Sequence, residues 1–166
     1  IPTLISTATA SNASSVDITS GIDSTYDEYM FVCTDVGPAT DGAEFQFQFN
    51  VAGASGFNET MTTTFFNAFQ REDGEDNSLA YVTGSDQAQG TGYQDFGHTL
   101  DNAADASLAG ILHLFSPSST TFITHFYGRS TSSSKSEGSV AIYDNYVAGY
   151  VNATGAVDEI SFKMSS

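Results

Sequence analysis

The feature that most constrains this chain is the stretch EFQFQFNVA at residues 44–52, in which apolar and polar side chains alternate. One set of alternate positions is apolar: Phe45, Phe47, Phe49 and Val51. The set between them is polar: Glu44, Gln46, Gln48 and Asn50. Successive side chains of a β-strand point to opposite faces, so a period of two indicates a strand. We expect one face of this strand to lie on a core and the other in water.

Similar runs rich in β-branched and aromatic residues recur along the chain. They are TLISTAT (3–9), SVDITS (15–20), EYMFVCTDV (28–36), TMTTTFFNAF (60–69), LAYVTG (79–84), GYQDFGH (92–98), LAGILHLF (108–115), TTFITHFYG (120–128), SVAIYDNYVAGYV (139–151) and VDEISFKM (157–164). Turn sequences rich in Gly, Ser, Asn and Asp separate them. About ten short strands at this spacing are typical of an antiparallel β-sandwich. We therefore expect an all-β, jelly-roll-like sandwich formed by one domain, residues 1–166.

Several local expectations follow from the same pattern. The turn GPATDGA (37–43) should join residues 28–36 and 44–52 as a hairpin. STSSSKSEG (130–138) has the composition of a mobile loop, and DNAADASLA (101–109) that of a helical turn or a loop. Cys33, the single cysteine, lies within a predicted strand and should be a buried small apolar residue.

Two histidines flank a predicted turn at residues 117–119. A hairpin there would place His113 and His125 diagonally on one face of the sheet. A zinc site would need a third ligand, and no spacing in the sequence fixes one. We interpret both histidines as residues of the sheet rather than as a metal site.

The balance of charge excludes whole classes of partner. The chain carries 20 acidic and four basic side chains, for a net charge of −16. A nucleic-acid interface or an anionic membrane surface needs a basic patch, which four cations cannot supply. No apolar run approaches the ~20 residues of a membrane-spanning helix. We expect neither nucleic-acid binding nor membrane insertion.

Motifs that would indicate catalysis or a cofactor are missing from the sequence. It contains no G-x-S-x-G elbow, P-loop, HExxH or CxxC, so we do not expect an enzyme. Calcium is the ion that the sequence could bind, because acidic loops of β-sandwiches can supply its oxygen ligands. The loop REDGEDN (71–77) offers Asp73, Glu75 and Asp76, and TDVGPATDGAE (34–44) is a second acidic stretch. Solvated loop charges are the simpler interpretation, and no other cofactor is expected.

The stretch IYDNYVAGY (142–150) is the best candidate for ligand binding. It contributes Tyr143, Asp144, Asn145, Tyr146 and Tyr150. Aromatic rings stack on the apolar faces of sugars, and Asn and Asp bind their hydroxyl groups. The same residues would also suit a core or a subunit interface, and the sequence leaves both interpretations open.

A family resemblance rests on sequence stretches that are spread over almost the whole chain. The matching stretches are LIST, SGIDSTYDEYMF, ATDGAEFQFQFN, LHLFSPSSTTFITHFYGRS and YDNYVAGYVNATGAVDEISFKMSS. With these the chain resembles small virion structural proteins of marine tailed bacteriophages. Members continue past KMSS into a short final strand, so we expect the full-length protein to do the same. The family carries no catalytic motif, and no functional residue is transferred from it.

The resemblance implies a protein of the virion, surface-exposed on the tail (as a fibre or receptor-binding part) or on the capsid as a decoration protein. Its expected partners are other copies of itself, as a homo-oligomer and in particular a trimer, and other virion proteins. A lectin-like module that binds host surface glycan is the alternative. An exposed concave aromatic patch would favour glycan binding. Aromatic side chains that are buried in the core and in subunit interfaces would favour the structural role.

Overall fold

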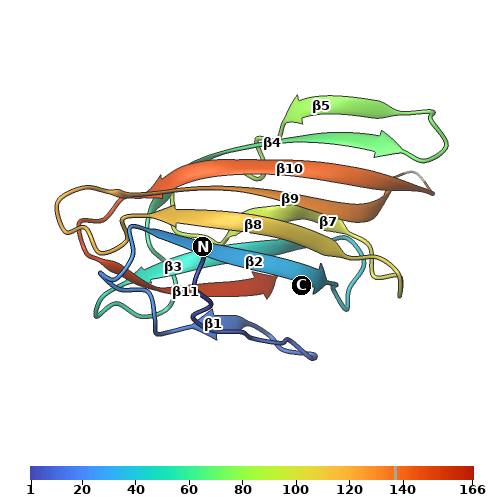
Figure 1. Cartoon of the computed structure of the whole chain (residues 1–166). Helices are drawn as coiled ribbons and strands as arrows, with labels where there is room; N and C mark the ends of the chain where they lie inside the picture. The colour runs from blue at the N-terminus through green and yellow to red at the C-terminus, as the bar shows by residue number, and fades with distance from the viewer. Residues whose placement is uncertain (137) are drawn as a thin grey trace.

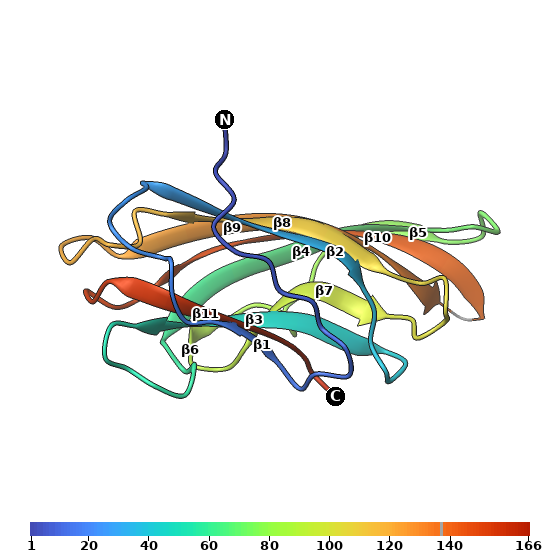
Figure 2. The ribbon, with the colours of Figure 1, turned by 60° about the horizontal axis from the view of Figure 1, so that its bottom comes forward.

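The computed structural model describes residues 1–136 and 138–166, which form two antiparallel β-sheets packed face to face (Figures 1 and 2). The four-stranded sheet has the order β1 (Val16–Ile18), β11 (Val157–Met164), β3 (Ala43–Val51) and β7 (Gln94–Leu100). The seven-stranded sheet has the order β2 (Glu28–Val36), β8 (Leu108–Phe115), β9 (Thr124–Ser136), β10 (Ser139–Val151), β4 (Met61–Arg71) and β5 (Asn77–Tyr81), and the short β6 (Ala88–Gly90) pairs with β4.

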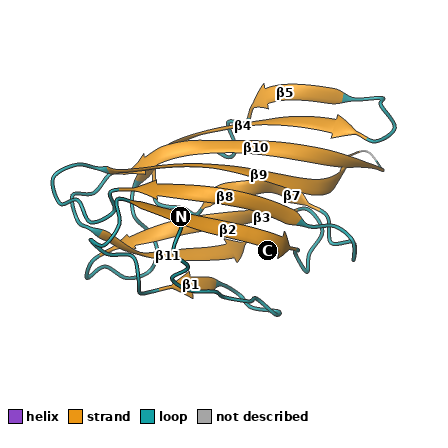
Figure 3. Ribbon diagram, viewed as in Figure 1, coloured by secondary structure: helices purple, strands orange, loops and turns teal. Residues whose placement is uncertain are grey.

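The predicted all-β sandwich is confirmed. The described residues contain strands and loops only, so none of them belongs to a helix that could cross a membrane (Figure 3). The chain passes repeatedly from one sheet to the other, and the two layers are seen edge-on in Figure 2.

Phenylalanine rings form the centre of the core between the sheets. Phe47 of β3 is fully buried, and its ring centroid lies 5.4 Å from that of Phe49, 6.1 Å from Phe96 and 5.3 Å from Phe126. Phe126 belongs to β9, so these contacts join the two sheets. Edge-to-face and tilted geometries of this kind add to the stabilisation that burial of apolar area provides.

The expectation that the second face of β3 lies in water is wrong for its C-terminal half. Gln48 and Asn50 are only 0% and 2% exposed. The Gln48 side-chain amide donates hydrogen bonds to the backbone carbonyls of Glu59, Thr91 and Gly92. The loops around these residues therefore cover the outer side of the strand, and a buried amide satisfies their backbone acceptors.

The predicted hairpin of residues 28–36 and 44–52 is also wrong. β2 pairs with β8 in one sheet, and β3 pairs with β11 and β7 in the other. The apolar face of each strand is buried against the opposite sheet: Phe31 of β2 contacts Phe162 of β11 with ring centroids 5.9 Å apart. The turn sequence correctly marked a chain reversal, but it did not determine in which sheet the chain continues.

The serine-rich stretch predicted as a loop is part of a strand. β9 runs through Ser136 and pairs with β10, and it buries Ser130, Ser132 and Ser134 to 1% exposure each. Glu137 of the same predicted loop lies outside the described residues. Conversely, residues 3–9 form no strand, and Leu4 is 82% exposed.

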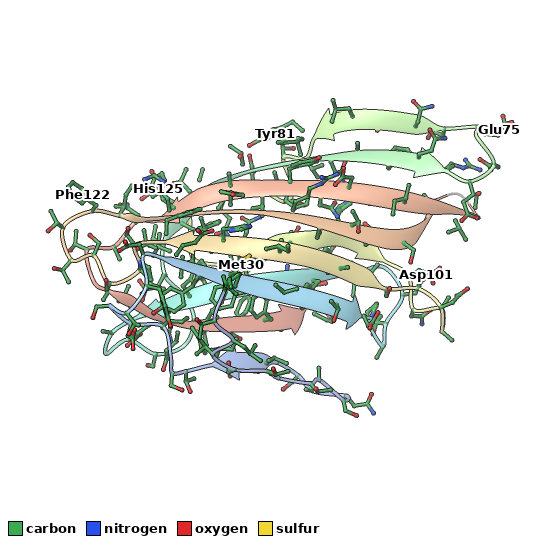
Figure 4. The ribbon with its side chains drawn as sticks, viewed as in Figure 1. Met30, Glu75, Tyr81, Asp101, Phe122 and His125 are labelled. Carbon is green, nitrogen blue, oxygen red and sulfur yellow. The ribbon has the colours of Figure 1, made fainter. Side chains whose placement is uncertain are left out.

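The connection between β8 and β9 is longer than predicted. β9 begins at Thr124, and Phe122 lies 74% exposed in the loop before it (Figure 4). The expected relation of the histidines is nevertheless confirmed, because His113 pairs with Tyr127 while Phe115 pairs with His125. Residues 101–107 form a turn without a helix.

Candidate functional site

The outward surface of the seven-stranded sheet, here called the outer face, is unusually apolar. Alternation along each strand buries one set of side chains and turns the other away from the core. The large apolar side chains on the outer face are between 39% and 73% exposed: Met30, Val32, Phe66, Leu79, Tyr81, Ile111, Tyr127 and Ile142. Met30 on β2 and Tyr81 at the end of β5 mark two sides of this surface in Figure 4. Its extent distinguishes it from isolated exposed residues, which are normal.

The strand register arranges these side chains in rows. The first row, here called the central row, runs from β5 to β2 through directly paired residues: Tyr81, Phe66, Tyr146, Arg129, Ile111 and Val32. Phe66 and Tyr146 stack with centroids 4.8 Å apart and ring planes at 2°. On the adjacent strand, the Arg129 guanidinium lies 5.1 Å from the centroid of the Tyr146 ring. Both contacts fix Tyr146 within the row.

The second row is formed by the neighbouring register positions: Thr64, Ala148, Tyr127, His113 and Met30. The His113 and Tyr127 rings stack with centroids 4.8 Å apart. The Nδ1 atom of His113 lies 2.6 Å from the Glu28 Oε1 atom. The histidine is thus held within the sheet by one ring contact and one polar contact.

Charge on these two rows is balanced locally. Arg129 is the one Arg or Lys side chain in these rows, and its Nε and Nη2 atoms donate hydrogen bonds of 2.8 Å to the two carboxylate oxygens of Asp144. The Arg129 hydrogen bonds lower the pKa of the Asp144 carboxyl. Such bidentate pairs are geometrically specific. The rows are therefore almost neutral in a chain with a net charge of −16.

A shallow hollow of about 590 Å³ lies beside the central row. Small residues, Ala109 and Gly110, are part of its lining, and Val32, Ile111 and Arg129 also contribute to it. Neighbouring Cys33 packs against the core, and burial raises the pKa of its thiol to about 11. Cys33 is therefore the small apolar residue that was predicted, but it is only partly buried and also lines the hollow.

The five residues predicted to bind a ligand do not share one face. Asp144, Tyr146 and Tyr150 lie on the outer face, whereas Tyr143 and Asn145 point toward the opposite sheet. Tyr143 contacts His98 with ring centroids 6.0 Å apart, and Asn145 is 1% exposed and donates to the Ser130 Oγ atom. A single ligand on one face of the sheet could not contact all five side chains.

The acidic residues predicted as calcium ligands form a turn. Asp73, Glu75 and Asp76 lie between β4 and β5, with Glu75 at its tip in Figure 4. The Asp73 carboxylate accepts hydrogen bonds from the Arg71 guanidinium, at 2.5 Å, and from the Glu75 backbone amide, at 3.0 Å. Among the described residues, no group of three or more His, Cys, Asp or Glu side chains is arranged to hold a metal ion. Calcium binding at this turn stays a prediction.

Sequence reasoning did not identify the central row, although a signal for it was present. Phe65 and Phe66 are adjacent in β4, so the alternation of a strand must turn one of them outward. The side-by-side placement of Phe66, Tyr146 and Arg129 depends on strand order, which no local pattern encodes. The chain matches no protein-family model, no curated protein and no solved structure.

Proposed function

We propose that this chain is a structural component of a bacteriophage virion and that it assembles as a homo-oligomer through the outer face. The observation that best supports self-assembly is the nearly neutral, apolar central row in a strongly acidic protein. The virion role rests on the family resemblance of the sequence. Tail and capsid positions are both compatible with it, and other virion proteins would be further partners.

The composition of the outer face is that of a protein interface. Interface cores are enriched in aromatic residues, Met and Arg and depleted of acidic residues and Lys. Met30, Tyr127, Tyr146 and Arg129 follow this pattern. Contiguous exposed apolar patches of this kind mark association surfaces in soluble proteins.

A second copy of the chain is the occupant that the charge distribution favours. Two chains of net charge −16 repel each other over most of their surfaces. Repulsion is smallest where the outer faces meet, because Arg129 and Asp144 neutralise each other there. We expect a closed symmetric assembly, since closure leaves no apolar face exposed, and we propose a trimer as its copy number.

Glycan binding on the outer face is less favourable than assembly. A sugar ring stacks on an exposed aromatic face. Tyr146 has Phe66 against one part of its ring and the Arg129 guanidinium over it, so its faces are already in contact with protein. At Tyr146, the centre of the outer face therefore fits a structural role better than the binding of a sugar.

Light scattering after size exclusion tests the proposal with a matched pair of variants. Ile111→Glu places a carboxylate in the middle of the central row, and Phe122→Glu places one on an exposed loop residue outside the outer face. We expect Ile111→Glu to be monomeric and Phe122→Glu to keep the native mass, with circular dichroism verifying that both fold. Equal masses for the two variants would overturn the assigned surface. A chelator should leave the mass unchanged.

A further inference from the structure

A polar pocket of about 250 Å³ lies between the four-stranded sheet and the connection from β5 to β6. Outward residues of β3, residues before and in β7, and the loop around residues 84–87 form its wall. The lining residues used below are Glu44, Gln46, Gly84, Asp86, Tyr93 and Asp95. The pocket meets the outer face at one point, because the Tyr81 hydroxyl of the central row donates a hydrogen bond of 2.6 Å to the Asp86 carboxylate.

Hydrogen bonds hold the floor of the pocket in place. The Gln46 side-chain amide donates to the Asp95 Oδ1 atom at 2.7 Å, and the two residues are directly paired across β3 and β7. Asp95 is only 9% exposed. A buried, hydrogen-bonded carboxyl group at the base of a concave site is a preorganised polar contact.

An aromatic ring forms a second fixed element. The Tyr93 hydroxyl donates to the Ser161 Oγ atom at 3.0 Å, and the Lys163 Nζ atom lies 4.2 Å from the centroid of the Tyr93 ring. The ammonium group covers one face of the ring, so the opposite face is the one against which a ligand could stack. Ring position and ring orientation are both set by neighbouring side chains.

We propose that this pocket binds the ring of a neutral saccharide. Tyr93 would stack on the apolar face of the sugar, while Gln46, Asp86 and Asp95 would bind its hydroxyl groups. The side-chain oxygens of Glu44, Gln46, Asp86 and Asp95 are hydrogen-bond acceptors in the wall. The wall is thus rich in acceptors, which suits a ligand that carries many hydroxyl donors.

Two other ligand classes fit the pocket less well. Three carboxylates, those of Glu44, Asp86 and Asp95, would repel phosphate, sulfate or a uronate. Metal binding is not favoured either, because the described residues include no group of three or more acidic, His or Cys side chains arranged for an ion. A neutral polyhydroxyl ligand meets neither obstacle.

The test is a titration of the ¹⁵N-labelled chain with glucose, galactose, mannose and N-acetylglucosamine, followed by amide chemical shifts. Gly84→Leu is designed to obstruct the pocket, and Gly92→Leu is its control, since an added Cβ at either glycine meets no atom within 4 Å. We expect saturable shifts at residues 84–87 and 93–95 with at least one sugar. Gly84→Leu should weaken that binding at least tenfold, and Gly92→Leu should not.

Other results would overturn the inference. No saturable shift with any of the four sugars at millimolar concentrations, or equal binding by the two glycine variants, would contradict it. Shifts produced by Ca²⁺ or Mg²⁺ and by none of the sugars would assign the pocket to a cation instead. Sugar binding is read from the amide shifts of residues 84–87 and 93–95, and assembly from the mass of Ile111→Glu, so either proposal can fail while the other holds.

Discussion

Arg129 and Asp144 lie diagonally across β9 and β10, joined by two hydrogen bonds of 2.8 Å. The pair also holds the guanidinium 5.1 Å from the centroid of the Tyr146 ring, which stacks on Phe66. An ion pair on an open surface contributes little to stability because water screens it. Its more important effect here is to keep the centre of an apolar surface neutral.

Removing the Arg129 charge should weaken association. Arg129→Leu leaves the Asp144 carboxylate unpaired at a surface that assembly would desolvate, so the dissociation constant should rise by about tenfold or more. The double variant Arg129→Leu/Asp144→Leu restores neutrality and should recover most of the loss. Sedimentation velocity measures both constants. Equal weakening in the single and double variants would show that neutrality is not what matters.

Truncation of the central core residue should be far more costly than truncation of an exposed one. Phe47 is fully buried against rings from both sheets, so Phe47→Ala should lower the free energy of unfolding by about 3–5 kcal/mol. Phe122→Ala, at a side chain 74% exposed, should stay within about 0.5 kcal/mol. Urea unfolding followed by fluorescence gives both values, and similar values would contradict the assigned core.

The fold class could be predicted because hydrophobic alternation is a local property. The alternation of Phe45, Phe47 and Phe49 indicated a strand without reference to the rest of the chain. Sheet membership is not local: β2 and β3 are joined by a short turn but belong to different sheets, because their apolar faces are buried against each other's sheet. The serine-rich part of β9 was missed because small hydroxyl side chains resemble a loop in composition, and only its pairing with β10 makes it a strand.

The glycines of the sheet interior offer a test of the packing. An added Cβ at Gly128 would lie 2.7 Å from the Phe96 Cε2 atom and 3.1 Å from the Ile111 carbonyl oxygen. Gly128→Ala should therefore destabilise the fold by about 1–3 kcal/mol through overpacking. Gly92→Ala, where nothing lies within 4 Å, should be neutral or slightly stabilising in thermal unfolding. A larger loss of stability in Gly92→Ala than in Gly128→Ala would show that β9 packs differently against β7.

The buried Asp95 makes stability depend on pH in an unusual direction. Burial is the largest cause that raises the pKa of Asp95 above 3.8, so the folded chain binds this proton more tightly than the unfolded chain. The stabilisation is therefore fully present below pH 3.8 and is lost as the pH rises through the folded-state pKa. Asp95→Asn keeps an acceptor for Gln46 and should unfold at a higher temperature than wild type at pH 7.

The control for this prediction is the same comparison at low pH. Below pH 3.8 both chains carry a neutral group at this position, so their midpoints should converge. A lower midpoint for Asp95→Asn at pH 7 would show that the carboxylate is stabilised in the folded state rather than penalised by burial.

The candidate site could be predicted from the sequence only in part. Tyr143 and Asp144 are adjacent in one strand, so alternation alone separates them onto opposite faces, and the proposed set of five could have been divided on that basis. The central row needed the strand order β5, β4, β10, β9, β8, β2, which depends on contacts far apart in the chain. The pocket near Tyr93 and Asp95 likewise combines residues from β3, β7 and an intervening loop.

Hydroxyl-radical footprinting of the native chain tests most directly whether the outer face is buried by self-association. Met30 and Tyr127 are 42% and 50% exposed in the isolated chain, and Phe122 is 74% exposed outside the outer face. We predict that oxidation of Met30 and Tyr127 slows several-fold between dilute and concentrated protein, while that of Phe122 does not change. Equal oxidation of all three at both concentrations would contradict assembly through this surface.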